Sequence, residues 1–473
     1  MKRVVIVGGG ITGLAIAHAL EKAEERCEVR IVEAGSHLGG NLVTIRHNGF
    51  IIDAGPDSWV ASKPHATRLA KAVGLGDELI GTRPDTRRVH IVWQRKLYPM
   101  PEGLILGVPT EIKPIVESEL LGWDAKMRAG LDLLVPPRQW KEDDDESIGS
   151  FISRRLGPDV AERIAGPLLG GIFAGDPYSL SVRACVPQLV EAEREHGSLV
   201  LAMRALKEKR REQSSSGGVQ PSAFISLKRG VGDLVVNVAH RLRDAEVFTR
   251  RAARRIDRLP EGDARGRWVV ETTEGPLFAD DVALAVPARV VAKLVADFDP
   301  ALAAMCSEIA YTSTATIFLA YRKYDVRHPL DSVGFLVPRA ENRPILACTF
   351  VSSKWDHRAP AGQILLRIFA GGAGNEAMVE RDDDELVRIA RGQVLDLLGI
   401  DRPPMFAKVF RFRGATPQPY VGHIPRVRRI LTRVAMHRGL HVGGNGYLGT
   451  GIPDAIRQGE EIAARIAPLR PSE

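Results

Sequence analysis

The sequence predicts a mixed α/β and α+β fold. It has a nucleotide-binding domain on a parallel sheet, a second domain on an antiparallel sheet, and a helical subdomain. Three observations support this prediction. A glycine-rich turn joins an apolar run to a helix pattern within residues 3–36, a second such turn lies within residues 440–466, and strand patterns fill residues 311–370. The 473 residues suffice for two or three domains.

The first turn has the composition of a dinucleotide-binding motif. Residues 4–7 form an unbroken apolar run, typical of a strand buried on both faces of a parallel sheet. Gly8, Gly10 and Gly13 follow in G-x-G-x-x-G spacing, which provides a tight turn, close approach to a pyrophosphate, and close packing of helix on strand. Glu33 ends the next apolar run, where it is placed to accept hydrogen bonds from a ribose. No arginine stands beside Glu33 to bind a 2′-phosphate, so NADP is disfavoured.

The second turn indicates a flavin. Residues 440–442 read as a strand, 443–451 as a glycine-rich turn and 452–466 as a helix, with Pro453 in its first turn. The partial positive charge of such a helix N-terminus stabilises an anionic reduced flavin ring. Nicotinamide enzymes do not need a C-terminal segment that folds back onto the N-terminal nucleotide-binding domain. We therefore expect FAD rather than NAD.

The middle of the chain is mostly helical and then mostly strands. Residues 104–206 follow a helical period with proline breaks, and the apolar residues within 109–140 are expected either to pack on a core of their own or to dock on a bilayer interface. Residues 207–221 are polar and Gly/Ser-rich, which predicts a mobile loop. Residues 87–93 and 96–99 read as a hairpin.

These patterns divide the chain into domains. We expect a Rossmann-like FAD-binding domain (1–60, 222–290 and 410–473), a substrate-binding domain (61–103 and 291–409), a helical subdomain of the membrane-docking type (104–206) and a flexible loop (207–221).

Composition excludes several functions. The net charge of +7 suits an anionic substrate or membrane surface, but the basic residues are scattered and not interleaved with aromatics, so we expect no nucleic-acid binding. The cysteines Cys27, Cys185, Cys306 and Cys348 are isolated, so no metal site is expected. No signal peptide or bilayer-spanning run is expected, which predicts a cytoplasmic protein, with peripheral attachment to the membrane left open.

Six motifs along the chain resemble one family. They are VGGGITGL, GPDSW, GIFAGDPYSLS, EREHGSL, ATPQPYVGH and GGNGYLGTGIPDAIRQG. The chain resembles the flavin-dependent porphyrinogen oxidases of haem biosynthesis, the protoporphyrinogen and coproporphyrinogen III oxidases, within the flavin amine oxidase superfamily. The first and last motifs are shared with that wider superfamily, which includes the amine oxidases and phytoene desaturases.

The resemblance implies an activity. We expect oxygen-dependent oxidation of a porphyrinogen to the porphyrin by three FAD-mediated two-electron steps that yield hydrogen peroxide. Protoporphyrinogen IX is favoured, with coproporphyrinogen III as the alternative. A flavin amine oxidase, a carotenoid desaturase-like enzyme and a non-catalytic FAD scaffold are the alternatives of other classes. Porphyrinogen and oxygen are the expected partners, and a homodimer is left open.

The resemblance also implies site residues. The expected FAD contacts are Gly8, Gly9, Gly10, Ile11, Thr12, Gly13, Glu33, Ala34, Asn41, Gly55, Pro56, Asp57, Ser58, Ala253, Phe412, Asn445, Thr450, Gly451 and Ile452. Ala253 and Phe412 stand where the family usually has Val and Trp. By motif match, the expected substrate residues for the apolar ring are Val333, Leu336 and Phe369. Lys63, just after the GPDSW turn, is a candidate for the substrate carboxylates because it is basic. No acid, base or metal ligand is assigned, and the flavin itself is expected to carry the chemistry.

Overall fold

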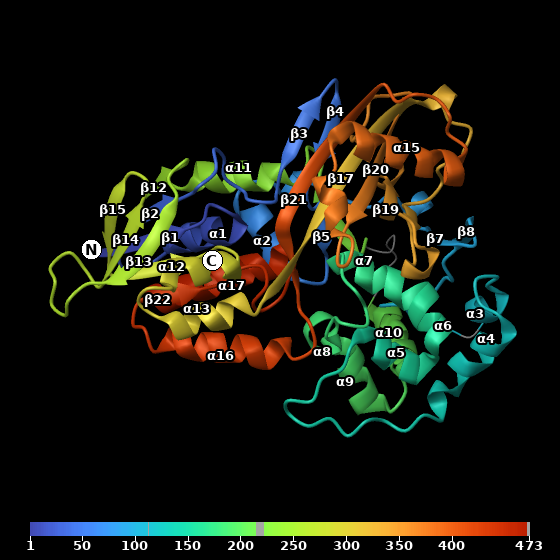
Figure 1. The fold of residues 1–473 in the computed structure, drawn as a ribbon, viewed down its shortest axis with the longest axis horizontal. Helices are drawn as coiled ribbons and strands as arrows, with labels where there is room; N and C mark the ends of the chain where they lie inside the picture. The colour runs from blue at the N-terminus through green and yellow to red at the C-terminus, as the bar shows by residue number, and fades with distance from the viewer. Residues whose placement is uncertain (112, 214–221, 471–473) are drawn as a thin grey trace. The chain divides into compact units, whose positions relative to one another are not determined.

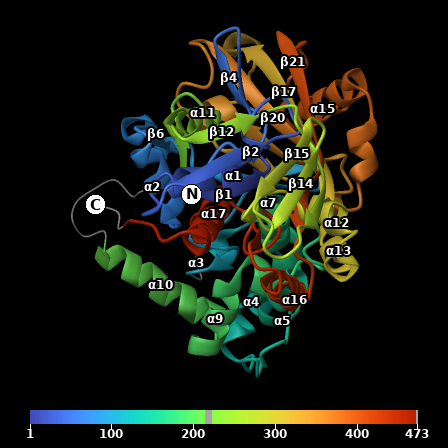
Figure 2. The ribbon, with the colours of Figure 1, turned by 90° about the vertical axis from the view of Figure 1, so that its left-hand side faces the viewer.

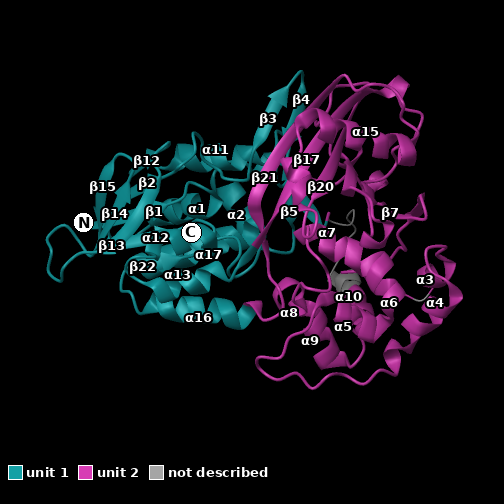
Figure 3. Cartoon of the chain, viewed as in Figure 1, with its two compact units in different colours: residues 1–80, 223–310, 424–473 teal, residues 81–222, 311–423 magenta. Residues whose placement is uncertain are grey.

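The computed structural model describes residues 1–111, 113–213 and 222–470 (Figure 1). The chain divides into two compact units (Figure 3). Unit 1 contains Met1–Ile80, Ala223–Ala310 and Ile424–Glu473, and unit 2 contains Gly81–Ser222 and Tyr311–His423. The mixed α/β class predicted from the sequence is confirmed.

Unit 1 is built on a parallel sheet. Its five strands lie in the order β12 (Ala245–Phe248), β2 (Cys27–Val32), β1 (Lys2–Val7), β16 (Asp281–Leu284) and β22 (Leu440–Val442). The central strand β1 is buried from its third residue onward, which explains its unbroken apolar run.

Two helices from opposite ends of the chain pack on each other against this sheet. They are α1 (Ile11–Leu20) and α17 (Ile452–Ile466), which lie side by side in Figures 1 and 2. A Cβ atom at Gly459 would lie 2.8 Å from the Ala15 Cβ, so small residues set the close approach. The interface belongs to one core in which Leu14, Ile16 and Ile456 are fully buried.

The remaining elements of unit 1 surround this centre. Strands β13 (Ala253–Arg258), β14 (Trp268–Thr272) and β15 (Gly275–Ala279) form an antiparallel sheet, and β3 (Thr44–His47) pairs with β4 (Phe50–Asp53). A small sheet orders β5 (Trp59–Val60), β11 (Phe224–Leu227) and β6 (Leu79–Gly81). The other helices are α2 (Pro64–Ala72), α11 (Gly232–Arg241), α12 (Ala288–Val295), α13 (Pro300–Ser307) and α16 (His423–Ala435).

A buried carboxylate joins α16 to α13. Asp299, which is 1% exposed, caps α13 by accepting from the Leu302 amide at 3.0 Å. It also accepts from Arg433 Nε at 2.8 Å and Nη2 at 3.0 Å, and its Oδ2 lies 2.5 Å from His437 Nε2. Burial would raise the pKa of Asp299, but these hydrogen bonds lower it more, so the pKa lies well below its usual range.

Unit 2 is built on a seven-stranded sheet. Its order is β21 (Phe406–Gln418), β17 (Ala310–Arg322), β20 (Gln363–Gly371), β19 (Ile345–Phe350), β18 (Gly334–Leu336), β7 (Val89–Trp93) and β8 (Lys96–Pro99). The antiparallel pattern predicted for residues 311–370 is confirmed, and the predicted hairpin extends the same sheet through the parallel pair β18 and β7. One face packs in a core with α15 (Asp383–Leu398).

The rest of unit 2 is mostly helical and has a core of its own. Its one strand pair among the described residues is β9 (Leu104–Ile105) with β10 (Val108–Pro109). The segments are α3 (Lys113–Glu117), α4 (Trp123–Gly130), α5 (Ile148–Leu156), α6 (Pro158–Val160), a π-helix (Ala161–Gly170), α7 (Gly171–Phe173), α8 (Val182–Cys185), α9 (Pro187–His196) and α10 (Leu199–Gln213). Helix α10 continues through residues 207–213, where a loop was predicted, because this stretch (KEKRREQ) consists of good helix formers. Residues 214–221 of the predicted loop lie outside the described residues.

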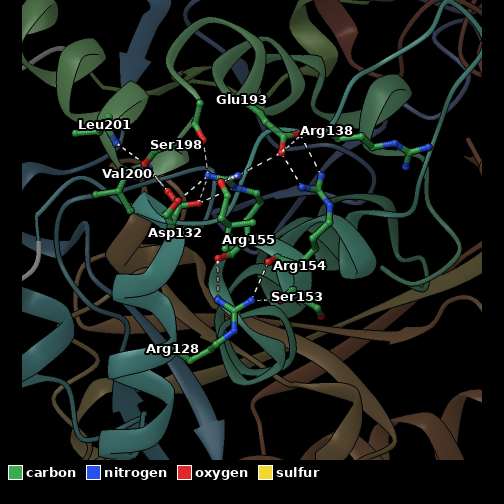
Figure 4. A network of polar contacts seen from close by, with 12 residues as sticks. Arg128, Asp132, Arg138, Ser153, Arg154, Arg155, Glu193, Ser198, Val200 and Leu201 are labelled. Carbon is green, nitrogen blue, oxygen red and sulfur yellow. Dashed lines mark hydrogen bonds and ion pairs between the residues drawn. The ribbon is translucent and has the colours of Figure 1, made fainter.

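A network of buried ions anchors the loop before α5 (Figure 4). Arg155 of α5 is fully buried and donates to Asp132 Oδ1 at 2.7 Å and to the carbonyls of Val135 and Gly197 at 2.8 and 2.7 Å. Glu193 accepts from Arg154 at 2.6 Å and from Trp140 at 2.9 Å. Because each buried charge has a counter-ion and further hydrogen bonds, the network holds the loop in one conformation.

No helix among the described residues has the length and apolar character needed to cross a bilayer.

The pKa of Asp299 leads to a prediction about acid stability. The carboxyl binds a proton more weakly in the folded than in the unfolded chain, so its stabilisation is complete above its unfolded pKa of about 4. This stabilisation is lost as the pH falls toward the lower folded pKa. We expect Asp299→Asn to lower the free energy of unfolding at neutral pH by about 2–3 kcal/mol, and the difference from the wild type to shrink below about pH 4.

Urea unfolding across this pH range measures the effect. Asp297→Asn is the matched control, because Asp297 is 64% exposed and 3.6 Å from its arginine partner. A constant difference between Asp299→Asn and the wild type at every pH would contradict the assignment.

Candidate functional site

The first glycine turn of unit 1 combines packing glycines with one open glycine. Gly8 has φ +106°, and a Cβ there would lie 2.5 Å from the Ala285 carbonyl oxygen. A Cβ at Gly13 would lie 2.0 Å from the Gly8 carbonyl oxygen. At Gly10 a Cβ would meet no described atom within 4 Å. Gly8 and Gly13 are therefore required by packing, whereas Gly10 leaves room for a ligand at the start of α1.

Glu33, predicted to bind a ribose, is held in place by two backbone amides. Its Oε2 accepts from the Gly9 amide at 2.8 Å, and its Oε1 accepts from the Gly35 amide at 2.6 Å. Each carboxylate oxygen keeps a further lone pair for a ligand hydroxyl. The Gly39 amide donates to the Gly9 carbonyl at 2.8 Å, which brings the loop that carries Asn41 beside the same turn.

The second glycine turn lies against the first. A Cβ at Gly444, whose φ is +117°, would lie 3.3 Å from Thr12 Oγ1. Thr12 is in the first turn of α1, and Gly444 is in the turn that leads to α17. The structure thus brings the predicted cofactor residues of the two ends of the chain together, with an N-terminus of a long helix at each turn.

Polar side chains of α17 hold the second turn. Gln458 Oε1 accepts from the Gly444 amide at 3.2 Å, and Arg457 donates to the Leu448 carbonyl at 2.8 Å. Asp454 accepts from the Gly451 amide at 3.3 Å and is itself held by Lys63 at 2.7 Å. Sequence reasoning missed Asp454, Arg457 and Gln458, although their spacing of three and four residues on one helix face is a recognisable signal.

A third segment completes the predicted cofactor residues of unit 1. The turn at residues 54–58 follows β4, where buried Asp53 accepts from the Val231 amide at 3.0 Å. Ser226 of β11 donates to the Asp57 carbonyl at 2.6 Å. The turn that contains Gly55–Ser58 is thereby fixed by a strand far away in the sequence.

Two predicted cofactor contacts lie outside these turns. Ala253 is half-buried at the start of β13, opposite Thr272. Phe412 is half-buried on β21 of unit 2. The segment that leads into Ala253 is bonded to the Glu33 segment, because the Arg251 amide donates to the Glu33 carbonyl at 2.9 Å.

Two of the predicted substrate residues share a face of the unit 2 sheet. Phe369 of β20 and Leu336 of β18 both stand directly opposite Ala347 of β19, so all three side chains point to one side. Arg367 is buried beside them, with its guanidinium 4.3 Å from the centre of the Phe369 ring. The opposite face carries the core that packs with α15. Val333 lies just before β18 and accepts from the Phe350 amide at 2.8 Å.

Two of the sequence motifs in unit 2 are bonded to each other. Gln418 donates to the Phe173 carbonyl at 2.9 Å, and the Ser181 amide donates to the Pro419 carbonyl at 2.8 Å. GIFAGDPYSLS and ATPQPYVGH therefore form one local structure, a pairing that the sequence did not predict.

The unit 1 geometry defines a dinucleotide-binding protein of the mixed α/β class. The residues fit such a group through the open space at Gly10, the fixed Glu33 carboxylate and the two helix N-termini. Residues 11–467 match the family described as flavin containing amine oxidoreductase, and the chain belongs to that family. This membership confirms the predicted FAD cofactor.

Three curated relatives match nearly the whole chain. The coproporphyrinogen III oxidase of Bacillus subtilis is 33% identical, over 97% of this chain and 96% of its own length. The enzyme of the same name from Staphylococcus aureus is 32% identical over 98% and 99%. The protoporphyrinogen oxidase of Bos taurus is 30% identical over 100% and 99%.

Solved structures show the same fold. A crystal structure from an Exiguobacterium strain has a TM-score of 0.86 and 32% identity, covering 98% of each chain. A putrescine oxidase bound to putrescine has a TM-score of 0.66 and 17% identity, covering 98% of each chain, which shows the fold alone.

Gly10 provides a test of the cofactor site. We expect Gly10→Val to fold normally and to be purified without flavin, because its side chain projects into the space at the start of α1 rather than into the protein. Absorbance of the purified protein and its melting temperature measure the two effects.

Gly392→Val is the matched control. A Cβ at Gly392, on α15 of unit 2, likewise meets no atom within 4 Å, so this variant should keep its flavin. A yellow Gly10→Val protein with full flavin content would contradict the placement.

Proposed function

We propose that the protein is an oxygen-dependent porphyrinogen oxidase of haem biosynthesis. The observation that carries the proposal is similarity over nearly the full length to relatives named for porphyrinogen oxidation, together with the family's flavin. We place coproporphyrinogen III first, because the two bacterial relatives of that name are 33% and 32% identical. Protoporphyrinogen IX, which the sequence favoured, is the second candidate and is supported by the bovine relative at 30% identity.

The reaction removes six electrons and six protons from the macrocycle in three steps. When bound, FAD supplies two-electron oxidation of a carbon centre and return of the electrons to oxygen as hydrogen peroxide. The residues of unit 1 would bind and orient this cofactor. The start of α1 would hold its pyrophosphate, Glu33 its ribose, and the turn before α17 its ring end.

The sheet face of unit 2 is suited to a wide, flat and largely apolar ring. Phe369 and Leu336 lie two strand spacings apart, about 10 Å, on one face. An aromatic side chain backed by a buried guanidinium gives a rigid surface on which such a ring can stack. We assign Phe369, Leu336 and Val333 to substrate contact. Lys63, predicted for the substrate carboxylates, has an ion pair within unit 1 that supports a different role, developed below.

Turnover separates the candidate functions. Purified holoprotein is incubated with oxygen and coproporphyrinogen III, protoporphyrinogen IX or putrescine, while porphyrin fluorescence and peroxide are recorded. We expect porphyrin with three peroxides for each ring oxidised, fastest with coproporphyrinogen III. Peroxide formed with putrescine but with neither porphyrinogen would identify an amine oxidase. If no substrate gives a product, a non-catalytic flavin-binding scaffold is the remaining candidate.

Phe369 tests the substrate face. We expect Phe369→Ala to raise the Michaelis constant for porphyrinogen about tenfold, because an aromatic stacking surface worth about 1.4 kcal/mol is lost. Flavin content should not change. Phe335→Leu is the control, since Phe335 is buried on the opposite face of the sheet. An unchanged constant in Phe369→Ala would remove this residue from the site.

We also propose that unit 2 makes a peripheral contact with a bilayer. Around α4 five large apolar side chains are strongly exposed: Trp123 (68%), Met127 (68%), Leu131 (47%), Leu133 (52%) and Leu134 (78%). Asp132, between these leucines, is fully buried and bound by Arg155 (Figure 4). This contact fixes the segment that carries the exposed leucines. A rigid cluster of this kind suits the headgroup–acyl boundary of a membrane.

Vesicle sedimentation tests this contact. We expect Leu134→Asp to weaken binding to anionic phospholipid vesicles about tenfold, since a buried leucine contributes about 1.5–3 kcal/mol. Leu395→Asp, at a residue 51% exposed on α15, should bind as the wild type does. Equal binding by both variants would contradict the proposed surface.

A further inference from the structure

An ion pair lies directly behind the second glycine turn of unit 1. Lys63, which precedes α2, donates from Nζ to both carboxylate oxygens of Asp454, at 2.9 and 2.7 Å. Asp454 is the third residue of α17 and is 9% exposed, whereas the Lys63 side chain is 46% exposed. The pair joins residues 391 positions apart in the chain.

Asp454 is built into the turn itself. Its Oδ2 accepts from the Gly451 amide at 3.3 Å, which caps the first turn of α17. A Cβ at Gly449 would lie 2.6 Å from the Asp454 carboxyl carbon, so the turn rests on the carboxylate and only a glycine fits there.

The position of this carboxylate creates an electrostatic conflict. A negative charge in the first turn stabilises a helix by opposing the partial positive charge of its N-terminus. The same positive charge is what an electron-rich, reduced flavin ring needs at this turn. Asp454 alone would therefore secure the turn but weaken its potential, and the ammonium of Lys63 removes this conflict by compensating the carboxylate.

We propose that Lys63 is a positioning residue for the flavin. It holds the carboxylate that supports the turn and cancels its charge, so that the start of α17 keeps a positive potential toward the reduced ring. The inference rests on the proposed binding of FAD at this turn and does not depend on which substrate is oxidised. It deepens the cofactor site with two residues, Lys63 and Asp454, that act through the turn.

The midpoint potential of the bound flavin tests the proposal. It is measured on the holoprotein by reductive titration for the wild type, Lys63→Met, Asp454→Asn and the double variant. We expect Lys63→Met to lower the equilibrium constant for two-electron reduction of the flavin about tenfold. This corresponds to a midpoint potential that is lower by about 30 mV. Asp454→Asn should raise the constant by a similar factor, and the double variant should return close to the wild type.

Two controls separate charge from structure. Lys71→Met removes the same charge from an exposed position on α2 and should leave the potential unchanged. Lys63→Arg keeps the charge and should restore the potential. Because Lys63 is half exposed, the shift in Lys63→Met should shrink at high salt.

Opposite shifts in the two single variants support the proposal. Equal potentials, or shifts in the same direction, in variants that keep their flavin overturn it. If Lys63→Met loses its flavin, the Asp454→Asn variant is compared with the double variant instead. These two proteins differ only in the charge at residue 63, so equal midpoint potentials in them would overturn the proposal. The titration uses no porphyrinogen, so a protein that fails to oxidise any porphyrinogen would refute the proposed function and leave this result standing.

Discussion

Helices α1 and α17 approach so closely at Gly459 that a single added carbon would meet Ala15 at 2.8 Å. The arrangement of the two glycine turns depends on this contact. Each helix begins at a glycine turn, and the packing places Thr12 of one turn against Gly444 of the other. Two helix N-termini, each with free amide donors and a partial positive charge, are thereby brought close together, an arrangement suited to a dinucleotide. The parallel sheet aligns both turns at the carboxyl ends of its strands, where ligands bind in folds of this type.

The turns themselves carry few side chains, so their shape comes from polar groups around them. Glu33 binds the first turn through the amides of Gly9 and Gly35. The second turn is hydrogen-bonded to the side chains of Asp454, Arg457 and Gln458, which lie on one face of α17. A glycine turn supported in this way is preorganised, so less conformational entropy is lost when the cofactor binds.

In unit 2, polar contacts likewise hold longer segments in place. The segments 173–181 and 418–420, far apart in the chain, are joined by backbone and amide hydrogen bonds. Arg155, Asp132 and Glu193 form a buried charge network whose partners come from α5, α9 and the loop before α5 (Figure 4). Removing one member of such a network leaves an uncompensated buried charge, which is far more costly than the net value of the intact cluster. The motif EREHGSL, which contains Glu193, therefore has a structural reason in this protein.

The sequence by itself determined the local elements and the cofactor. Glycine spacing, continuous apolar runs and alternating patterns are properties of neighbouring residues, and they identified β1, α1, β22, α17 and the antiparallel strands of unit 2. The tertiary structure decided which charges meet. Lys63, predicted for a substrate carboxylate, forms an ion pair with Asp454, and nothing in the spacing of the two residues indicates this pair. Likewise, residues 207–213 were expected to be mobile but extend α10. Short-range patterns fix backbone conformation, whereas partners hundreds of residues apart are chosen only when packing brings their side chains within bonding distance.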